Sequence, residues 1–287
     1  MKQAVDHKVD GFLRFRLNLS YDGTDFAGWA KQPGLRTVQG ELIKALTQIF
    51  GKTKDDFGLR VAGRTDAGVH AEGQVVHIDL NPKQLKRLGR SKDVLINLNA
   101  LLPVDIRVSK FVETHADFDA RFAAKYRKYR YRIADSVSGW NPLYGRTALW
   151  LKYELDIAAM QDAAEVLIGL HDFAAFSKPK EKATTIRTLQ HVKITRNKHF
   201  DNVVEIELQA DAFAHNMVRS IVGALIKVGA GRVTKAEVAK ALKSKSRGHG
   251  FKVVGPEGLS LIEVGYPVQA QWAEQVKMTQ DMRTLDE

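Results

Sequence analysis

The chain has 287 residues, of which 44% are hydrophobic and none is cysteine. This is enough apolar material for one large core or two ordinary ones. The lack of cysteine excludes disulfides, zinc knuckles, cysteine-held iron–sulfur clusters and thiol nucleophiles. Lysine and arginine number 44 against 33 aspartates and glutamates, and the surplus of 11 charges is spread along the chain. We therefore expect an extended basic surface and a polyanionic partner, most often a nucleic acid.

No apolar run approaches the roughly 18 residues that cross a membrane. Residues 1–10 are polar and of mixed charge, without the apolar core of a signal peptide. We therefore expect a cytoplasmic protein with no membrane partner.

The first part of the chain predicts a strand, a turn and a helix. Residues 13–20 alternate apolar with polar side chains, which is the period of a half-buried strand. Residues 21–24 have the composition of the turn that ends it. Thr37 is placed to cap a helix whose apolar positions recur at helical spacing through residues 38–50.

Two short strands are predicted next, near residues 59–62 and 74–80, with residues 63–71 holding the loop between them. Catalytic residues often lie on loops that a rigid scaffold positions. A basic stretch of helical character, residues 82–102, closes this half of the chain.

The second half of the chain repeats this mixture of strands and helices. Strands are predicted near residues 128–134, 189–195, 203–210 and 259–264, and helices at 156–168, at 215–228 and after the capping box of Thr234 and Glu237.

The mixture lacks the long regular βα repeat of a doubly wound sheet. We therefore predict an α+β fold of two domains, each a mainly antiparallel sheet with helices on one face, and a basic active-site cleft between them. The predicted parts are an N-terminal extension at 1–12, a domain at 13–115, a second domain at 116–268 and a polar tail at 269–287.

One carboxylate stands out in the loop at residues 63–71, where Asp66 lies between Arg64 and a glycine turn. The nearby cation favours the ionised form of the carboxyl group. An ionised aspartate is suited to nucleophilic attack or proton abstraction rather than to general-acid catalysis. Spacing alone favours the plainer alternative, a surface turn with an Arg–Asp pair, and it is the remaining motifs that support a catalytic role.

The segment Lys-Tyr-Arg-Lys-Tyr-Arg-Tyr-Arg at residues 125–132 interleaves cations with aromatic rings. On a strand, Tyr129 would face one side of the sheet, and Lys128 and Arg130 the other. Such a surface suits RNA, because cations bind phosphates and a ring can stack on an unstacked base. An ordinary sheet with solvated cations is an equally good interpretation of the pattern.

Three further features bear on the chemistry. Arg219 lies within the apolar pattern of the helix at 215–228, where a buried cation needs an anion, although an exposed face is the alternative. His70 and His77 are seven residues apart with no third ligand nearby, which does not favour a metal site. No phosphate-binding or dinucleotide-binding glycine motif is present, so we expect no cofactor.

With these residues in view, the sequence from Phe15 to Pro267 closely resembles the tRNA pseudouridine synthase A (TruA) family. The most specific match is the stretch at 63–71 followed by Gly73-Gln74-Val75. Other matching motifs, in chain order, are Tyr21-Asp22-Gly23-Thr24, Gly28-Trp29, Thr37-Val38-Gln39, residues 128–131, residues 215–219 and Glu257-Gly258-Leu259. Ala30 departs from the glutamine usual in the family, but it lies outside the motif that carries Asp66.

The resemblance implies isomerisation of uridine to pseudouridine at positions 38 to 40 of tRNA, in the anticodon stem-loop. It also implies a homodimer with a basic cleft and no metal or cofactor. By motif position, Asp66 resembles the catalytic aspartate, Tyr129 the ring that stacks on the target base, and Arg64 an arginine that assists base flipping. Arg219 matches an arginine that pairs with the aspartate, and Leu259 an apolar wall residue.

Two other functions are compatible with the residues. The first is a pseudouridine synthase that acts on another RNA, such as rRNA or a different tRNA site. The second is a non-catalytic RNA-binding protein or chaperone, which has no need for a carboxylate among arginines.

Overall fold

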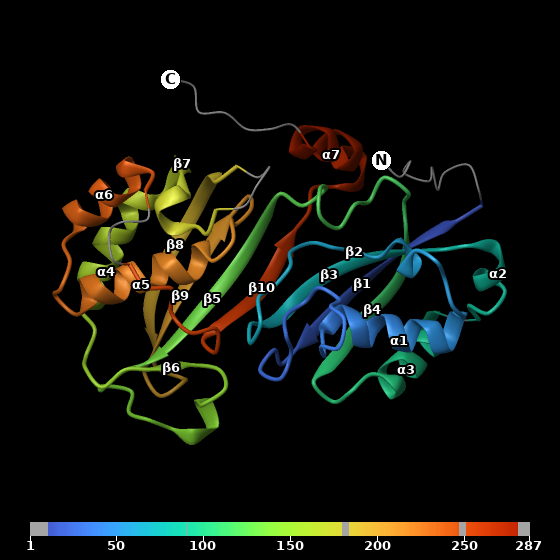
Figure 1. Ribbon diagram of the computed structural model, residues 1–287, viewed down its shortest axis with the longest axis horizontal. Helices are drawn as coiled ribbons and strands as arrows, with labels where there is room; N and C mark the ends of the chain where they lie inside the picture. The colour runs from blue at the N-terminus through green and yellow to red at the C-terminus, as the bar shows by residue number, and fades with distance from the viewer. Residues whose placement is uncertain (1–10, 90, 180–183, 247–250, 281–287) are drawn as a thin grey trace. The chain divides into compact units, whose positions relative to one another are not determined.

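The computed structural model describes residues 11–89, 91–179, 184–246 and 251–280. The chain forms two compact units, which divide between Lys125 and Tyr126 and again between Ile262 and Glu263. The long strand pairs are antiparallel, and a short pair in the second unit is parallel. The predicted α+β class with mainly antiparallel strands is therefore confirmed (Figure 1).

In the first unit, β1 is paired to β3 on one side and to β4 on the other. Its strands are β1 (Leu13–Tyr21), β2 (Arg60–Val61), β3 (His70–Leu80) and β4 (Ile106–Thr114). Its helices are α1 (Val38–Phe50), α2 (Pro82–Leu85), α3 (Ser91–Leu101) and α7 (Trp272–Gln280), with single 3-10 turns at Asp56–Gly58 and Gln269–Gln271.

The predicted strand and helix of this unit form for the expected reasons. Alternate residues of β1 are buried, among them Leu17, which pairs with Val76 of β3 and Phe111 of β4. Thr37 caps α1, since its Oγ1 accepts the N–H of Gly40 at 3.2 Å. Helices α1 and α3 contact each other over the strands of this unit (Figure 1).

Aromatic side chains near the end of the chain pack against this unit. The stretch expected as a polar tail contains α7, whose Trp272 ring lies 4.9 Å from the ring of Phe118. Tyr266 also contacts Phe118, at 4.9 Å, and the guanidinium of Arg16 lies over both of these rings. These ring contacts connect residues 266 and 272 to Phe118 and, through Arg16, connect Tyr266 to β1.

The second unit has the strand order β10-β5-β9-β8-β7, with β6 beside β5. Its strands are β5 (Tyr126–Ala134), β6 (Leu149–Trp150), β7 (Gly169–Asp172), β8 (Ile186–Asn197), β9 (Val203–Ala210) and the first residues of β10 (Leu259–Gly265). Its helices are α4 (Ile157–Ala164), α5 (Met217–Gly229) and α6 (Lys235–Ser244), with 3-10 turns at Pro142–Tyr144, Glu165–Leu167 and Phe173–Phe176.

Helix α5 is the core helix of the second unit. All of its residues are buried except Arg219 and Lys227, which are half-buried. Gly223 lies against the chain at Lys252, where an added Cβ would be 2.1 Å from the carbonyl oxygen. Over the described residues, no helix is both long and apolar enough to cross a membrane.

Candidate active site

Asp66 lies on the loop that joins β2 to β3, as predicted from the two flanking strands. The loop turns at Gly68, whose φ is +77°, and the N–H of Val69 donates to the carbonyl oxygen of Asp66 at 3.2 Å. Asp66 is half-buried and Arg64 is exposed, whereas Thr65 between them is buried. The backbone therefore points Thr65 inward and leaves both neighbouring charged residues accessible.

The loop after β1 packs against the Asp66 loop through main-chain contacts. The N–H of Trp29 donates to the carbonyl oxygen of Thr65 at 3.0 Å. Gly28, with φ of +94°, lies so near that an added Cβ would be 3.0 Å from the same oxygen. At Gly23, an added Cβ would be 2.0 Å from the carbonyl oxygen of Val69. Both glycines are therefore required by the close approach of the two loops.

A group of buried polar side chains lies beneath the loop. The hydroxyl groups of Tyr21 and Thr65 are 2.8 Å apart, and Nε2 of Gln74 donates to the Tyr21 oxygen at 3.2 Å. Burial raises the pKa of Tyr21 to about 12, so its phenol is protonated at neutral pH. The sequence analysis missed these residues as functional candidates. A signal was present at Gln74, an uncharged polar residue on the same face of β3 as Val76, Ile78 and Leu80.

His70 and His77 each accept a main-chain N–H on Nδ1. The donor is Gly23 for His70, at 3.0 Å, and Ala120 for His77, at 2.9 Å. In the part of the chain that the structure describes, no three histidine, aspartate or glutamate side chains are grouped as metal ligands. The two histidines thus connect β3 to the segments that pack on it.

Tyr129 lies on β5 in the second unit, where the predicted alternation is observed. Odd-numbered residues from Arg127 to Ile133 are buried and the even-numbered ones are half-buried. Tyr129 is 7% exposed, and the ring of Phe213 meets its ring nearly at right angles with centres 5.2 Å apart. This edge-to-face contact fixes the plane of the Tyr129 ring.

The half-buried row of β5 faces two carboxylates of β9. Lys128 Nζ is 2.7 Å from Glu207, Arg132 Nε is 2.9 Å from Glu205, and Arg130 Nε is 3.7 Å from Glu205. The cations of this row are therefore paired with carboxylates of the neighbouring strand. Lys128 and Arg130, the predicted RNA contacts, are held in place by these pairs.

Arg219 connects α5 to the chain that leads into β10. Its Nε donates to the carbonyl oxygen of Val254 at 2.7 Å, and its own carbonyl oxygen accepts the N–H of Val254 at 3.4 Å. Tyr131 of β5 fixes the same segment through a 2.8 Å hydrogen bond to the carbonyl oxygen of Gly255. Leu259, the first residue of β10, is buried immediately after this segment.

The predicted site residues fall into two sets. Asp66 and Arg64 belong to the first unit, and the second unit holds Tyr129, Lys128, Arg130, Arg219 and Leu259. Within the second unit, β5, β10 and α5 position the five residues. The expected pairing of Asp66 with Arg219 joins residues of different units and stays a prediction.

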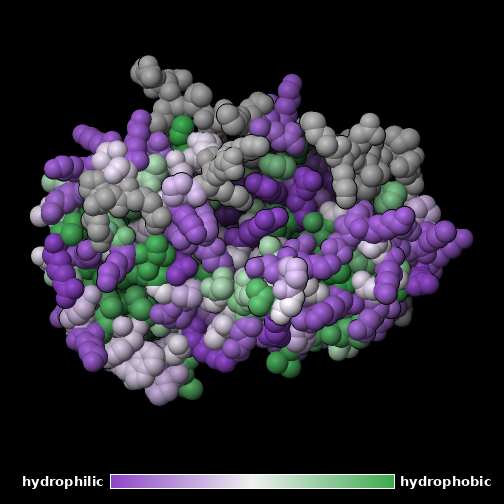
Figure 2. Space-filling view, in the orientation of Figure 1, coloured by the Kyte–Doolittle hydropathy of each residue, from purple (hydrophilic) through white to green (hydrophobic). Residues whose placement is uncertain are grey.

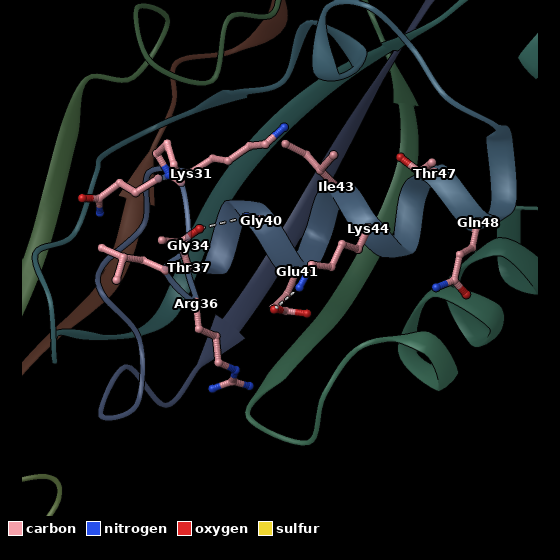
Figure 3. A pocket seen from close by; sticks show the side chains of 13 residues that line it. Lys31, Gly34, Arg36, Thr37, Gly40, Glu41, Ile43, Lys44, Thr47 and Gln48 are labelled. Carbon is pink, nitrogen blue, oxygen red and sulfur yellow. Dashed lines mark hydrogen bonds and ion pairs between the residues drawn. The ribbon is translucent and has the colours of Figure 1, made fainter.

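A hollow of about 850 Å³ lies in the first unit, along α1 and the loop before it (Figure 3). Its rim carries cations, but each has a carboxylate partner. Lys44 pairs with Glu41, as Figure 3 shows, and Arg36 Nη1 lies 2.7 Å from Asp105. None of the described residues that line this hollow is a predicted site residue.

Comparisons with known proteins identify relatives over nearly the whole chain. A family described as tRNA pseudouridine synthase matches residues 163–267, which include α5 and Leu259. The chain is 46% identical to tRNA pseudouridine synthase A of Leifsonia xyli, with 96% of this chain and 100% of that one covered. It is 47% identical to the enzyme of that name from Streptomyces avermitilis, covering 98% and 97%. The chain belongs to the tRNA pseudouridine synthase A family. The counterpart from Mycobacterium leprae is 41% identical over 95% of this chain and 96% of its own, and the resemblance predicted from the motifs is confirmed.

Proposed function

We propose that this protein isomerises uridine to pseudouridine in the anticodon stem-loop of tRNA, at positions 38 to 40, with Asp66 as the catalytic residue. The observation that carries the proposal is the Asp66 loop, which presents a half-buried carboxylate beside an exposed arginine. Near full-length identity of 46% to a tRNA pseudouridine synthase A supports the reaction and the substrate class.

The reaction breaks the bond from N1 of uracil to C1′ of the ribose, turns the base and joins C5 to C1′. The proton on C5 leaves to solvent and N1 gains one, so the product is an isomer of the substrate. Asp66 acts either by attack on the sugar or base, or by removal of a sugar proton that opens a glycal-like route. Each route needs the carboxylate in its ionised form.

The target base must leave its stack before it can turn, at a cost of about a few kcal/mol. We assign the receiving ring to Tyr129, whose plane is fixed by the edge contact with Phe213 at 5.2 Å. Arg64 assists flipping from the loop of Asp66, and Leu259 lines the apolar wall. By the family's motif, Arg219 is assigned as the arginine that pairs with Asp66, and its guanidinium is half-buried on the core helix α5.

The RNA partner is held through the excess of basic side chains, of which Lys128 and Arg130 are the assigned phosphate contacts. The net charge of +11 supports a broad electrostatic surface rather than a single phosphate site. On the face drawn in Figure 2, hydrophilic side chains are interspersed with smaller hydrophobic groups. A cytoplasmic homodimer is the proposed working form.

The substrate assignment is tested by mapping pseudouridine in tRNA transcripts that carry uridine at only one of positions 38, 39 and 40. We expect modification at these positions, and none in a transcript with cytidine at all three. Modification that persists in the all-cytidine transcript would assign the enzyme to another tRNA site. An unmodified tRNA together with a modified rRNA fragment would assign it to a different RNA.

A further inference from the structure

The orientation of the Gln74 side chain is fixed by two main-chain groups. Its Nε2 donates to the carbonyl oxygen of Gly63 at 2.7 Å, and its Oε1 accepts the N–H of Val75 at 3.2 Å. A reversed amide would place two acceptors together at Gly63 and two donors together at Val75. The second hydrogen of Nε2 is therefore directed to the Tyr21 oxygen, 3.2 Å away.

The orientation of the Gln74 amide bears on the direction of the hydrogen bond between Tyr21 and Thr65. Among the described residues, the hydroxyl group of Tyr21 has Gln74 and Thr65 as its partners. Since Gln74 donates to this oxygen, the buried Tyr21 O–H still needs an acceptor for its own proton, and Oγ1 of Thr65 at 2.8 Å is the acceptor within reach. Tyr21 is 5% exposed, Gln74 is fully buried and Thr65 is 6% exposed, so water does not compete for these bonds.

Both ends of this hydrogen-bond chain fall on the loop of Asp66. Gln74 binds the carbonyl oxygen of Gly63, and Tyr21 binds the side chain of Thr65. The N–H of Trp29 donates to the carbonyl oxygen of Thr65. Asp66 follows Thr65 directly, so the peptide bond between them positions the Asp66 backbone. Three directed hydrogen bonds therefore set the position from which the Asp66 side chain extends.

We infer that Tyr21 and Gln74 are positioning residues for Asp66, acting through Gly63 and Thr65 without touching the substrate. The inference rests on the proposed function, because it takes Asp66 as the catalytic carboxylate. Small displacements of a catalytic group are costly, with roughly 100-fold in rate for about 1 Å.

The first test is Tyr21→Phe, which removes the hydroxyl and keeps the ring that packs on Trp29 with centres 6.0 Å apart. With a tRNA transcript bearing 5-tritiated uridine, we expect kcat to fall roughly 10- to 100-fold while KM changes about twofold or less. The matched control is Tyr266→Phe, which removes a 2.7 Å hydrogen bond to the carbonyl oxygen of Ala120 in the same unit. This control is expected to keep kcat, and an equal loss in both variants would overturn the inference.

A second test uses Thr65, the acceptor of the Tyr21 proton. Thr65→Val removes the hydroxyl at nearly constant volume, and Thr65→Ser restores it. We expect Thr65→Val to lower kcat as Tyr21→Phe does, and Thr65→Ser to retain most of the wild-type kcat. The double variant Tyr21→Phe, Thr65→Val should have a kcat no lower than that of either single variant. Additive losses in the double variant would show that the two hydroxyls do not act through one bond.

A readout independent of turnover separates this inference from the proposed function. Amide hydrogen exchange of residues 63–69 should be faster in Tyr21→Phe than in the wild type and in Tyr266→Phe, with exchange elsewhere unchanged. Unchanged exchange in this loop would overturn the positioning role. If Asp66→Asn keeps full turnover while Tyr21→Phe still loosens the loop, the catalytic assignment fails and the structural role of Tyr21 stands.

Discussion

Gly28 brings the loop after β1 into contact with the peptide that carries Asp66. Its φ of +94° is unfavourable for any side chain, and an added Cβ would lie 3.0 Å from the Thr65 oxygen and 3.2 Å from the Ala67 nitrogen. Neither atom can move without moving the Asp66 backbone between them. The geometry of the Asp66 loop therefore depends on the absence of a methyl group at residue 28.

We predict that Gly28→Ala lowers stability by roughly 1–3 kcal/mol through backbone strain and also lowers kcat of the folded enzyme. Gly34→Ala is the matched control, because Gly34 also has positive φ, +71°, but no atom within 4 Å of an added Cβ. Thermal melting measures the strain in both variants, and tritium release per folded molecule measures kcat. Equal kcat in the two variants would contradict the contact argument.

Residue-level prediction from sequence succeeds where a short motif contains the whole signal. The Asp66 loop is such a case, because the arginine, aspartate and turn glycines are adjacent in the chain. The role of Tyr21 is different, since its partners Thr65 and Gln74 are 44 and 53 residues away. No spacing rule connects them before the antiparallel pairing of β1 with β3 is known.

Element-level prediction is accurate for several elements with one buried face, but it missed β4, although Ile106, Val108 and Phe111 of that strand are buried. Alternation on β1 and β5 and the caps at Thr37 and Thr234 are observed as predicted. Helix α7 is not predictable in this way, because it has no buried residue and is anchored chiefly by its first side chain, Trp272. Strand β7 has only four residues, too few to show a period.

Asp135 connects the end of β5 to β8 and to the chain before α4. Its carboxylate accepts two hydrogen bonds from Arg196, at 2.7 and 3.0 Å, and one from the N–H of Leu155 at 3.0 Å. Burial alone would raise its pKa, but these hydrogen bonds outweigh burial and lower the pKa below the ordinary 3.8. Ionised Asp135 therefore contributes stability above about pH 4, which is lost as the pH falls through the lowered pKa.

We predict that Asp135→Asn lowers the free energy of unfolding at pH 7 by about 3 kcal/mol, because it leaves Arg196 without its buried anion. The loss should shrink at pH 3 and below, as the wild-type carboxylate becomes protonated. Asp162→Asn is the control, since its pair with Lys235 is exposed and screened by solvent, and we expect it to leave stability almost unchanged. Denaturant unfolding at both pH values measures the difference, and a pH-independent loss would contradict the linkage argument.

The whole molecule carries a large positive net charge, which bears on how it binds RNA. The net charge of +11 predicts that binding of tRNA releases counterions and weakens with added salt. Lys128→Gln should reduce the magnitude of the salt slope by about 1, as expected for loss of one phosphate contact. Lys44→Gln, which removes an equally paired cation from α1, is expected to leave the slope unchanged. Filter binding across a salt series measures both, and a flat response in the wild type would contradict the basic surface.

The catalytic role of Asp66 is tested most directly by tritium release from a tRNA transcript that carries 5-tritiated uridine. Wild-type enzyme should release tritium, and Asp66→Asn should release none while it still binds the tRNA, because phosphate contacts supply most of the affinity. Asp55→Asn, an exposed aspartate of the same unit whose side chain makes no cap hydrogen bond, should behave as the wild type. Retained turnover in Asp66→Asn would remove the central assignment.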